Sequence, residues 1–315
     1  MRCLHLRKYL VQKRGTYENY ELLISMKIIL LGILFQCLNT LSGSSFDTIT
    51  KIFGNKAFEW HHYYSIGNIA SLLLFLFYLN FNGGIKNNII LKTKSSYIIP
   101  LLRGLIFIPI PIIVFNSIKH VPLNVFTSVL MTTPFFILLF SKLIQNEKIS
   151  INNLVILIIG FGGAYMVIKP SIGLSNYYIY AILLVAIHNA ITNIVVSKYS
   201  SNATTYGYTF YYFLPLTIVA TIFFIADPIL PELFDLLLII TSGIFIILSV
   251  LFWTAAFHIA GKYSRIISPF LFTQLIWSSI FGYIYFGEIL DEIAVIGIIL
   301  IIISGSISLI YTKKI

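Results

Sequence analysis

Ten long apolar runs dominate this sequence, and their length limits what the chain can fold into. They lie at residues 28–46, 63–80, 97–118, 122–142, 151–168, 177–197, 206–226, 234–258, 264–286 and 290–311. A helix needs about 20 apolar residues to cross a bilayer, and most runs are too long for strands and lack the alternation of a membrane β-barrel. With 58% hydrophobic and 10% charged residues, the chain is predicted to be an all-α polytopic membrane protein with ten transmembrane helices.

The short connections between these runs leave little room for a soluble catalytic domain. The sequence contains no P-loop, no G-x-S-x-G segment and no His/Glu or Cys/His cluster with metal-ligand spacing. Its two cysteines, Cys3 and Cys37, form no disulfide framework. We therefore expect no catalytic residue, no metal and no cofactor, and we predict that the protein is not an enzyme.

The positive charge of the chain is distributed unevenly between the two sides of the membrane. The net charge is +10, from 21 Lys and Arg against 11 Asp and Glu. When successive connections alternate between sides, Lys51, Lys56, Lys119 and Lys169 fall on one side and the remaining 17 on the other. Cytoplasmic loops are enriched in Lys and Arg, so both termini are predicted to be cytoplasmic. The excess charge is then an orientation signal, and we expect no nucleic acid partner.

An internal repeat predicts the domain organisation. A run, a polar connection and a run with paired small residues occur after Val121 and again after Tyr263. The predicted units are a basic cytoplasmic tail (1–27), repeat 1 (28–168), a linker (169–176) and repeat 2 (177–312). Part of the tail is interpretable as an overlong gene start. Each repeat has five helices, an odd number, so the second enters the membrane inverted, as in many secondary transporters.

Polar and aromatic side chains within the runs are candidates for a substrate cavity, because a polar group facing lipid leaves its hydrogen bonds unmade. For the polar stripe around His188, cavity lining and interhelical hydrogen bonding remain equally good interpretations. Arg103 is expected either to snorkel to the cytoplasmic face, which is the preferred interpretation, or to meet an anionic group of the substrate. For Ser42, helix packing is preferred to cavity lining. The candidate cavity residues are Asn39, Ser42, Arg103, His188, Asn189, Asn193, Trp253, Gln274 and Trp277.

All acidic residues fall in tails, connections or predicted helix ends. Asp47 and Lys51, one helical turn apart, are interpreted as an interfacial surface pair. A charge at the bilayer centre is costly and is retained mainly for ion or proton relays. The lack of a carboxylate near the middle of any run therefore favours a facilitator or exchanger, or coupling through another group, over a carboxylate-based proton relay.

Small residues in two runs predict close helix packing, since glycine lets backbones approach each other in lipid. They lie in the fifth and tenth predicted helices, and we expect these two helices to form a scaffold. We also expect a homodimer through small-residue helix faces. The residues are Gly160, Gly163, Ala164, Gly297, Ser304 and Gly305.

Short motifs recur in a characteristic order along the chain. The first half carries Leu102-Arg103-Gly104, Thr133-Pro134-Phe135 and Glu147, and the second carries Ser268-Pro269-Phe270, Thr273-Gln274 and Phe286-Gly287-Glu288. This series resembles the ten-helix EamA-type permeases of the drug/metabolite transporter superfamily. Within that family, the chain is most similar to the S-adenosylmethionine uptake transporters.

The resemblance implies a multi-pass secondary transporter of the bacterial inner membrane. It would move a small polar or amphipathic metabolite by alternating access, through a midplane cavity formed mainly by helices 1, 3, 4, 6, 8 and 9. S-adenosylmethionine, by uptake or exchange, is the leading substrate, and the expected partners are this small molecule and the lipid bilayer. One alternative is a permease or exporter for amino acids, other metabolites or drugs. The other, outside the transporter class, is a non-transporting scaffold or a lipid-handling enzyme.

Overall fold

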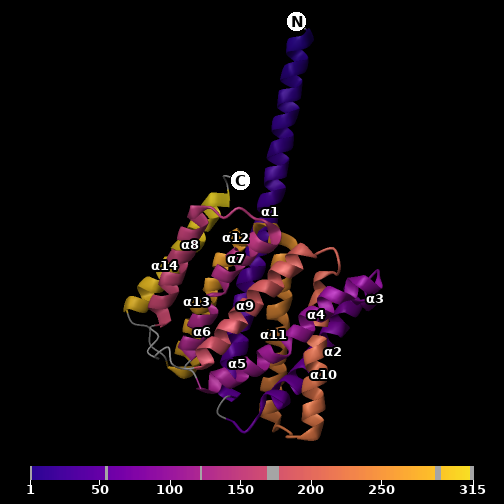
Figure 1. Cartoon of the computed structure of the whole chain (residues 1–315), viewed down its shortest axis with the longest axis vertical. Helices are drawn as coiled ribbons and strands as arrows, with labels where there is room; N and C mark the ends of the chain where they lie inside the picture. The colour runs from indigo at the N-terminus through magenta and orange to yellow at the C-terminus, as the bar shows by residue number, and fades with distance from the viewer. Residues whose placement is uncertain (1, 54–55, 121–122, 169–176, 288–291, 313–315) are drawn as a thin grey trace.

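The fold is a bundle of helices, shown in Figure 1 as a computed structural model that describes residues 2–53, 56–120, 123–168, 177–287 and 292–312. These residues contain no strand. The α-helices are α1 (Arg2–Phe53), α2 (Trp60–Phe81), α3 (Ile85–Ile89), α4 (Ile98–Phe107), α5 (Pro109–His120), α6 (Leu123–Leu130), α7 (Thr133–Gln145), α8 (Ile151–Ile168), α9 (Tyr177–Lys198), α10 (Thr205–Ala226), α11 (Leu233–Ala260), α12 (Ser264–Ile267), α13 (Thr273–Phe286) and α14 (Glu292–Thr312). Three short 3-10 helices complete the set: η1 (Lys94–Tyr97), η2 (Gly261–Tyr263) and η3 (Ser268–Phe272). The predicted linker at 169–176 lies outside the described residues.

Six helical segments of the described chain are long and apolar enough to cross a membrane, so the protein is an all-helical polytopic membrane protein. The segments are Leu23–Phe53, Trp60–Phe81, Lys94–Ile118, Tyr177–Lys198, Thr205–Ala226 and Leu233–Phe286. Shorter apolar helices cover Thr133–Gln145, Ile151–Met166 and Val295–Ser304. The residues of the predicted tail continue α1 as one helix, whose first part projects beyond the bundle (Figure 1).

The outer surface of the bundle is apolar, whereas much of its interior is polar. Large side chains such as Leu73, Phe77 and Ile222 are more than half exposed, which suits contact with lipid chains. Asn68, Ser117 and Thr254 are at most 1% exposed. This distribution is expected for a membrane protein that keeps a polar interior among its helices.

Helices α8 and α14 pack against each other, as their small residues predicted. They lie side by side at one edge of the bundle (Figure 1). A Cβ atom on Gly163 of α8 would lie 2.6 Å from the Gly297 carbonyl oxygen of α14. In addition, Ser304 Oγ donates a hydrogen bond to the Ile156 carbonyl oxygen at 2.8 Å. Helices α8 and α14 therefore approach so closely that glycine is required where they meet.

Three of the predicted spans are interrupted within the bundle. One break separates α4 from α5 at Ile108, before Pro109; another separates α6 from α7 at Met131 and Thr132; the third is η3, with Pro269 in its first turn. Proline lacks an N–H group and so interrupts helical hydrogen bonding. Threonine hydroxyls satisfy carbonyl groups freed at two breaks: Thr133 Oγ1 donates to Leu130 O and Thr273 Oγ1 to Phe270 O, each at 2.6 Å.

Candidate substrate cavity

A cavity lies where the interrupted helices meet the continuous ones. Its wall includes Phe107 and Ile110 beside the α4–α5 break, Met131 at the α6–α7 break and Leu271 in η3. Its volume is about 130 Å³, measured as the space open to the centres of water molecules. On that measure one water needs about 10–15 Å³, so the cavity has room for a small solute or a group of waters.

The polar part of the cavity wall includes residues of α1, α7, α9, α11 and α13. Asp47 of α1 accepts a hydrogen bond from Gln274 Nε2 of α13 at 3.0 Å. Ser249 Oγ of α11 donates to Asn39 Oδ1 of α1 at 2.8 Å. Thr133 of α7 and Asn189 of α9 also line the cavity. Helices from both halves of the chain therefore place hydrogen-bonding groups around one space.

Aromatic rings make up much of the remaining wall. Phe107 stacks on Tyr212 with 3.9 Å between ring centroids, and Phe46 packs against Tyr64 at 6.3 Å. Trp253 also lines the cavity, and its indole Nε1–H is buried without a hydrogen-bond partner among the described residues. An unpaired buried donor is costly, and a polar group that reached this N–H would remove that cost.

The candidate residues from the sequence divide into two groups. Asn39, Asn189, Trp253 and Gln274 line the cavity. Ser42, Arg103, His188, Asn193 and Trp277 are not part of its wall among the described residues. A role for either group in substrate binding stays a prediction.

Arg103 does not extend to the membrane surface, so the snorkelling expectation was wrong. Its side chain is 4% exposed and faces the bundle interior. The guanidinium carbon lies 4.1 Å from the centre of the Tyr212 ring, and both terminal nitrogens lie 3.4 Å from Thr254 Oγ1. Gly104, the next residue, allows this approach, because a Cβ there would meet the Tyr211 carbonyl oxygen at 2.1 Å.

The polar stripe on α9 makes hydrogen bonds mainly within its own helix. Asn193 Nδ2 donates to the Asn189 carbonyl oxygen at 2.6 Å, and Thr192 Oγ1 donates to the His188 carbonyl oxygen at 2.9 Å. The His188 ring packs against Phe107, with 6.0 Å between centroids. Of this stripe, only Asn189 reaches the described cavity wall.

Comparison with known proteins places this architecture among transporters. No protein-family model matches the chain. The S-adenosylmethionine uptake transporter of Rickettsia prowazekii is 27% identical over 295 residues, which cover 92% of this chain and 96% of that protein. The pseudopaline exporter CntI of Pseudomonas aeruginosa is 28% identical over 217 residues, covering 68% of this chain and 75% of that protein. Over most of its length the chain is therefore similar to membrane transporters.

A solved crystal structure supports the fold of this transporter. It superposes with a TM-score of 0.66 at 14% identity and covers 92% of this chain and 98% of the solved one. The relatives are transporters and not enzymes, which agrees with the prediction that this chain is not an enzyme. The transporter is a multi-pass protein of the inner membrane, as its apolar helices and its bacterial relatives indicate.

Asp47 is the cavity residue of this transporter that the sequence reasoning missed. It is 9% exposed and contacts Gln274, so it does not belong to an interfacial surface pair. Lys51 instead places its Nζ atom 4.0 Å from the centre of the Phe286 ring. Asn39, Gly43 and Asp47 are spaced by four residues and all line the cavity. This spacing on one helix face was the available signal.

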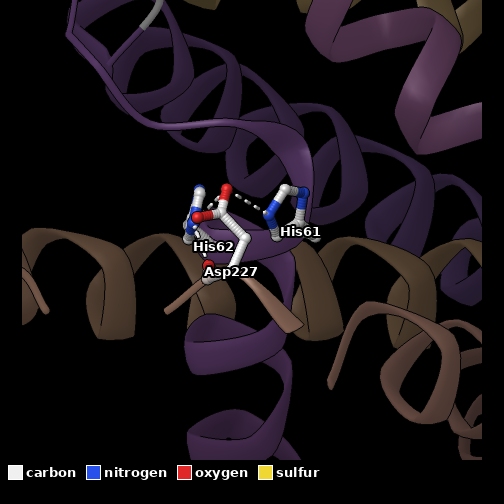
Figure 2. Close-up of side chains that lie close together, drawn as sticks. All are labelled: His61, His62 and Asp227. Carbon is white, nitrogen blue, oxygen red and sulfur yellow. Dashed lines mark hydrogen bonds and ion pairs between the residues drawn. The ribbon is translucent and has the colours of Figure 1, made fainter. Parts of the chain in front are cut away.

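A second polar cluster lies at the opposite end of the bundle from the start of α1, where α2 begins and α10 ends (Figure 2). The Nε2 atoms of His61 and His62 are each 3.8 Å from Asp227 Oδ2. His62 Nδ1 accepts from the Glu59 N–H at 3.0 Å, so its Nε2 carries the proton, which it donates to the Asp227 carbonyl oxygen at 2.7 Å. A protonated nitrogen cannot ligate a metal. The cluster fits a link between α2 and α10 better than a metal site.

Proposed function

We propose that this transporter moves a small polar or amphipathic metabolite across the cytoplasmic membrane by alternating access. The observation that carries the proposal is the cavity at the interrupted helices, with Asn39 and Asp47 from one half and Asn189, Trp253 and Gln274 from the other. Non-helical backbone at membrane depth is tolerated where it lines a cavity, and transporters place their substrate sites there. A non-transporting scaffold gives no reason for such a cavity.

Ten helices in two inverted repeats form part of the proposal, and the helix contacts support it. If α1, α2, α4–α5, α6–α7 and α8 correspond to α9, α10, α11, α12–α13 and α14, each major contact has a counterpart. The α1–α13 contact matches α9–α7, α2–α11 matches α10–α4, and α1–α11 matches α9–α5. The pairs α2–α10 and α8–α14 match themselves. A pseudo-two-fold axis between residues 28–168 and 177–312 accounts for this pattern.

The cytoplasmic location proposed for both termini agrees with the arrangement of the chain. The last described turns of α14 lie at the end of the bundle from which the first part of α1 projects (Figure 1). Lys148 and Arg265, both counted on the cytoplasmic side, are joined by a hydrogen bond from the Arg265 guanidinium to the Lys148 carbonyl oxygen at 2.9 Å. The excess of Lys and Arg on this side then indicates that this end of the bundle faces the cytoplasm.

A homodimer remains part of the proposal, but its interface must differ from the faces of Gly160 and Gly163. These glycines already contact the partner helices of their own chain, next to Phe272, Ser304 and Gly297. Gly162, on another face of α8, has no atom within 4 Å of where its Cβ would lie. A second copy is therefore proposed to pack on that outward face.

S-adenosylmethionine is the proposed substrate, by uptake or exchange. Four relatives named S-adenosylmethionine uptake transporters align over 92% of this chain. The relative named as an exporter favours a second candidate, efflux of a different metabolite. Amino acids, other metabolites and drugs belong to that second candidate.

Transport is tested with the purified full chain in proteoliposomes. We expect labelled S-adenosylmethionine to accumulate in a saturable manner and to exchange with unlabelled S-adenosylmethionine loaded inside. If another metabolite of a panel exchanges and S-adenosylmethionine does not, the substrate assignment is wrong and the transport function stands. If no compound of the panel moves faster than through empty liposomes, the transport function is wrong.

A further inference from the structure

We infer that the Asp47 carboxylate recognises a positively charged group of the transported solute, an ammonium or sulfonium group held between this carboxylate and the aromatic wall. The inference rests on the proposed transport function and assigns the chemical class of its substrate. It names a residue of α1 that the sequence pattern placed at the membrane surface.

The charge distribution in the cavity is the first argument. Among the described residues that line the cavity, Asp47 is the sole Asp, Glu, Lys, Arg or His. The nearby buried cation, Arg103, is directed at Tyr212, Tyr208 and Thr254 and is not part of the wall. No basic side chain of the lining therefore neutralises the Asp47 carboxylate.

The hydrogen bonding of Asp47 is the second argument. An ionised carboxylate offers about four lone-pair positions, and the described residues fill one, through the neutral amide of Gln274. A buried charge without a partner of opposite sign is strongly disfavoured. A solute cation in the cavity supplies that partner, and Gln274 holds the carboxylate in place to receive it.

The aromatic rings are the third argument. Tyr64, Phe107, Tyr212 and Trp253 line the same cavity as Asp47, and Phe46, the preceding residue on α1, packs against Tyr64. Aromatic faces attract organic cations through their quadrupoles, most strongly when water is excluded. Aromatic rings without the carboxylate would serve any flat apolar solute. Both together select a cation that carries apolar substituents.

The test compares matched cationic and neutral ligands, so that charge is the main variable. One pair is S-adenosylmethionine and S-adenosylhomocysteine, which differ by a methyl group and the sulfonium charge. The other is choline and its neutral isostere 3,3-dimethylbutan-1-ol. Binding to the purified full chain is followed by tryptophan fluorescence, because Trp253 lines the cavity, and uptake is measured in proteoliposomes.

We expect at least one cation to bind the wild-type transporter at least about tenfold more tightly than its neutral partner. Asp47→Asn should remove this discrimination by weakening cation binding alone, whereas Asp47→Glu should retain part of it. The matched control is Asp227→Asn, the same chemical change at an exposed site outside the cavity, and it should leave the discrimination unchanged.

Two results would overturn the inference while the transport function stands. One is wild-type binding that ignores the charge of the ligand, which needs no variant to observe. The other is an equal loss of neutral and cationic uptake in Asp47→Asn, which would make Asp47 a proton-coupling or structural residue. If no ligand of either pair binds or enters, the inference fails; if the wider metabolite panel also fails, the proposed function fails with it.

Discussion

The α8–α14 pair and the two interrupted spans, α6–α7 and α12–α13, solve different physical problems with similar small and polar residues. The α8–α14 pair is built from helices without breaks, and Gly163 brings α8 against the Gly297 backbone. The interrupted spans carry Pro134 and Pro269, and hydroxyl groups satisfy their freed carbonyls. Close packing removes room for movement, whereas we expect a break with satisfied hydrogen bonds to act as a hinge. The contrast separates the part that holds the bundle together from the part that surrounds the cavity.

The largest effect is expected from Gly163→Ala in the α8–α14 pair. The new Cβ would lie 2.6 Å from a backbone oxygen, so the helices must separate, at a cost of about 1–3 kcal/mol. Gly162→Ala is the matched control, because its Cβ meets nothing within 4 Å; it should gain up to about 1 kcal/mol in helix propensity. Thermal unfolding midpoints in detergent should therefore shift in opposite directions. Equal shifts would mean that α8 and α14 are not tightly packed.

The next largest effect is expected from Pro269→Ala in η3. The substitution restores an N–H group and removes a steric barrier to helix, so the break should stiffen. We expect a severalfold lower transport rate with an unchanged or slightly higher unfolding midpoint. Pro231→Ala, in the loop before α11, is the control and should alter neither quantity. A normal rate in Pro269→Ala would show that the break is not a hinge.

A smaller effect on transport is expected from Gln274→Ala at the cavity wall. It removes the hydrogen bond that positions the Asp47 carboxylate but leaves the carboxylate itself in the cavity, so apparent affinity should fall only about two- to threefold. His188→Ala should change affinity less, because His188 lies outside the described wall. Uptake kinetics measured at several substrate concentrations distinguish the two. The reverse order would show that the stripe on α9 forms the binding site.

The smallest effect is expected from Glu147→Gln, where α7 meets α12. Burial raises the pKa of Glu147 above its ordinary value of 4.5, although a hydrogen bond from Ser264 and the charge of Arg265 lower it. The folded state therefore holds this proton more tightly than the unfolded state, and its contribution to stability is lost as pH rises above about 4.5. The Gln variant should show a flatter dependence of the unfolding midpoint on pH. Glu232→Gln, at an exposed position, should leave the dependence unchanged.

The sequence predicted the long apolar helices well because hydrophobic length is a strong signal. The run at 177–197 became α9 (Tyr177–Lys198), and the run at 63–80 became α2 (Trp60–Phe81). The predicted packing of the fifth and tenth helices was confirmed by the α8–α14 contact. These features depend on composition averaged over many residues, which a single sequence supplies.

Features decided by single residues were harder to predict. The breaks were not expected, although Pro109 and the Thr133-Pro134 pair were visible, because hydropathy stays high across them. Asp47 was missed because the first run was ended at residue 46, whereas α1 continues to Phe53. Arg103 was expected at the surface because its helix face cannot be determined without knowing that α10 packs beside α4. The residues that line the cavity are likewise determined by which helices pack together, and a single sequence does not give this packing.

The helices of this transporter differ in length, so the thickness of the bilayer affects them differently. With a rise of 1.5 Å per residue, α8, with 18 residues, is about 27 Å long and α11, with 28, is about 42 Å. The hydrocarbon core measures about 30 Å, so α8 matches it while α11 must tilt or extend into the headgroups. Ser249 and Trp253 of the cavity wall lie on α11. We therefore expect acyl-chain length in the surrounding membrane to affect the cavity through the tilt of α11.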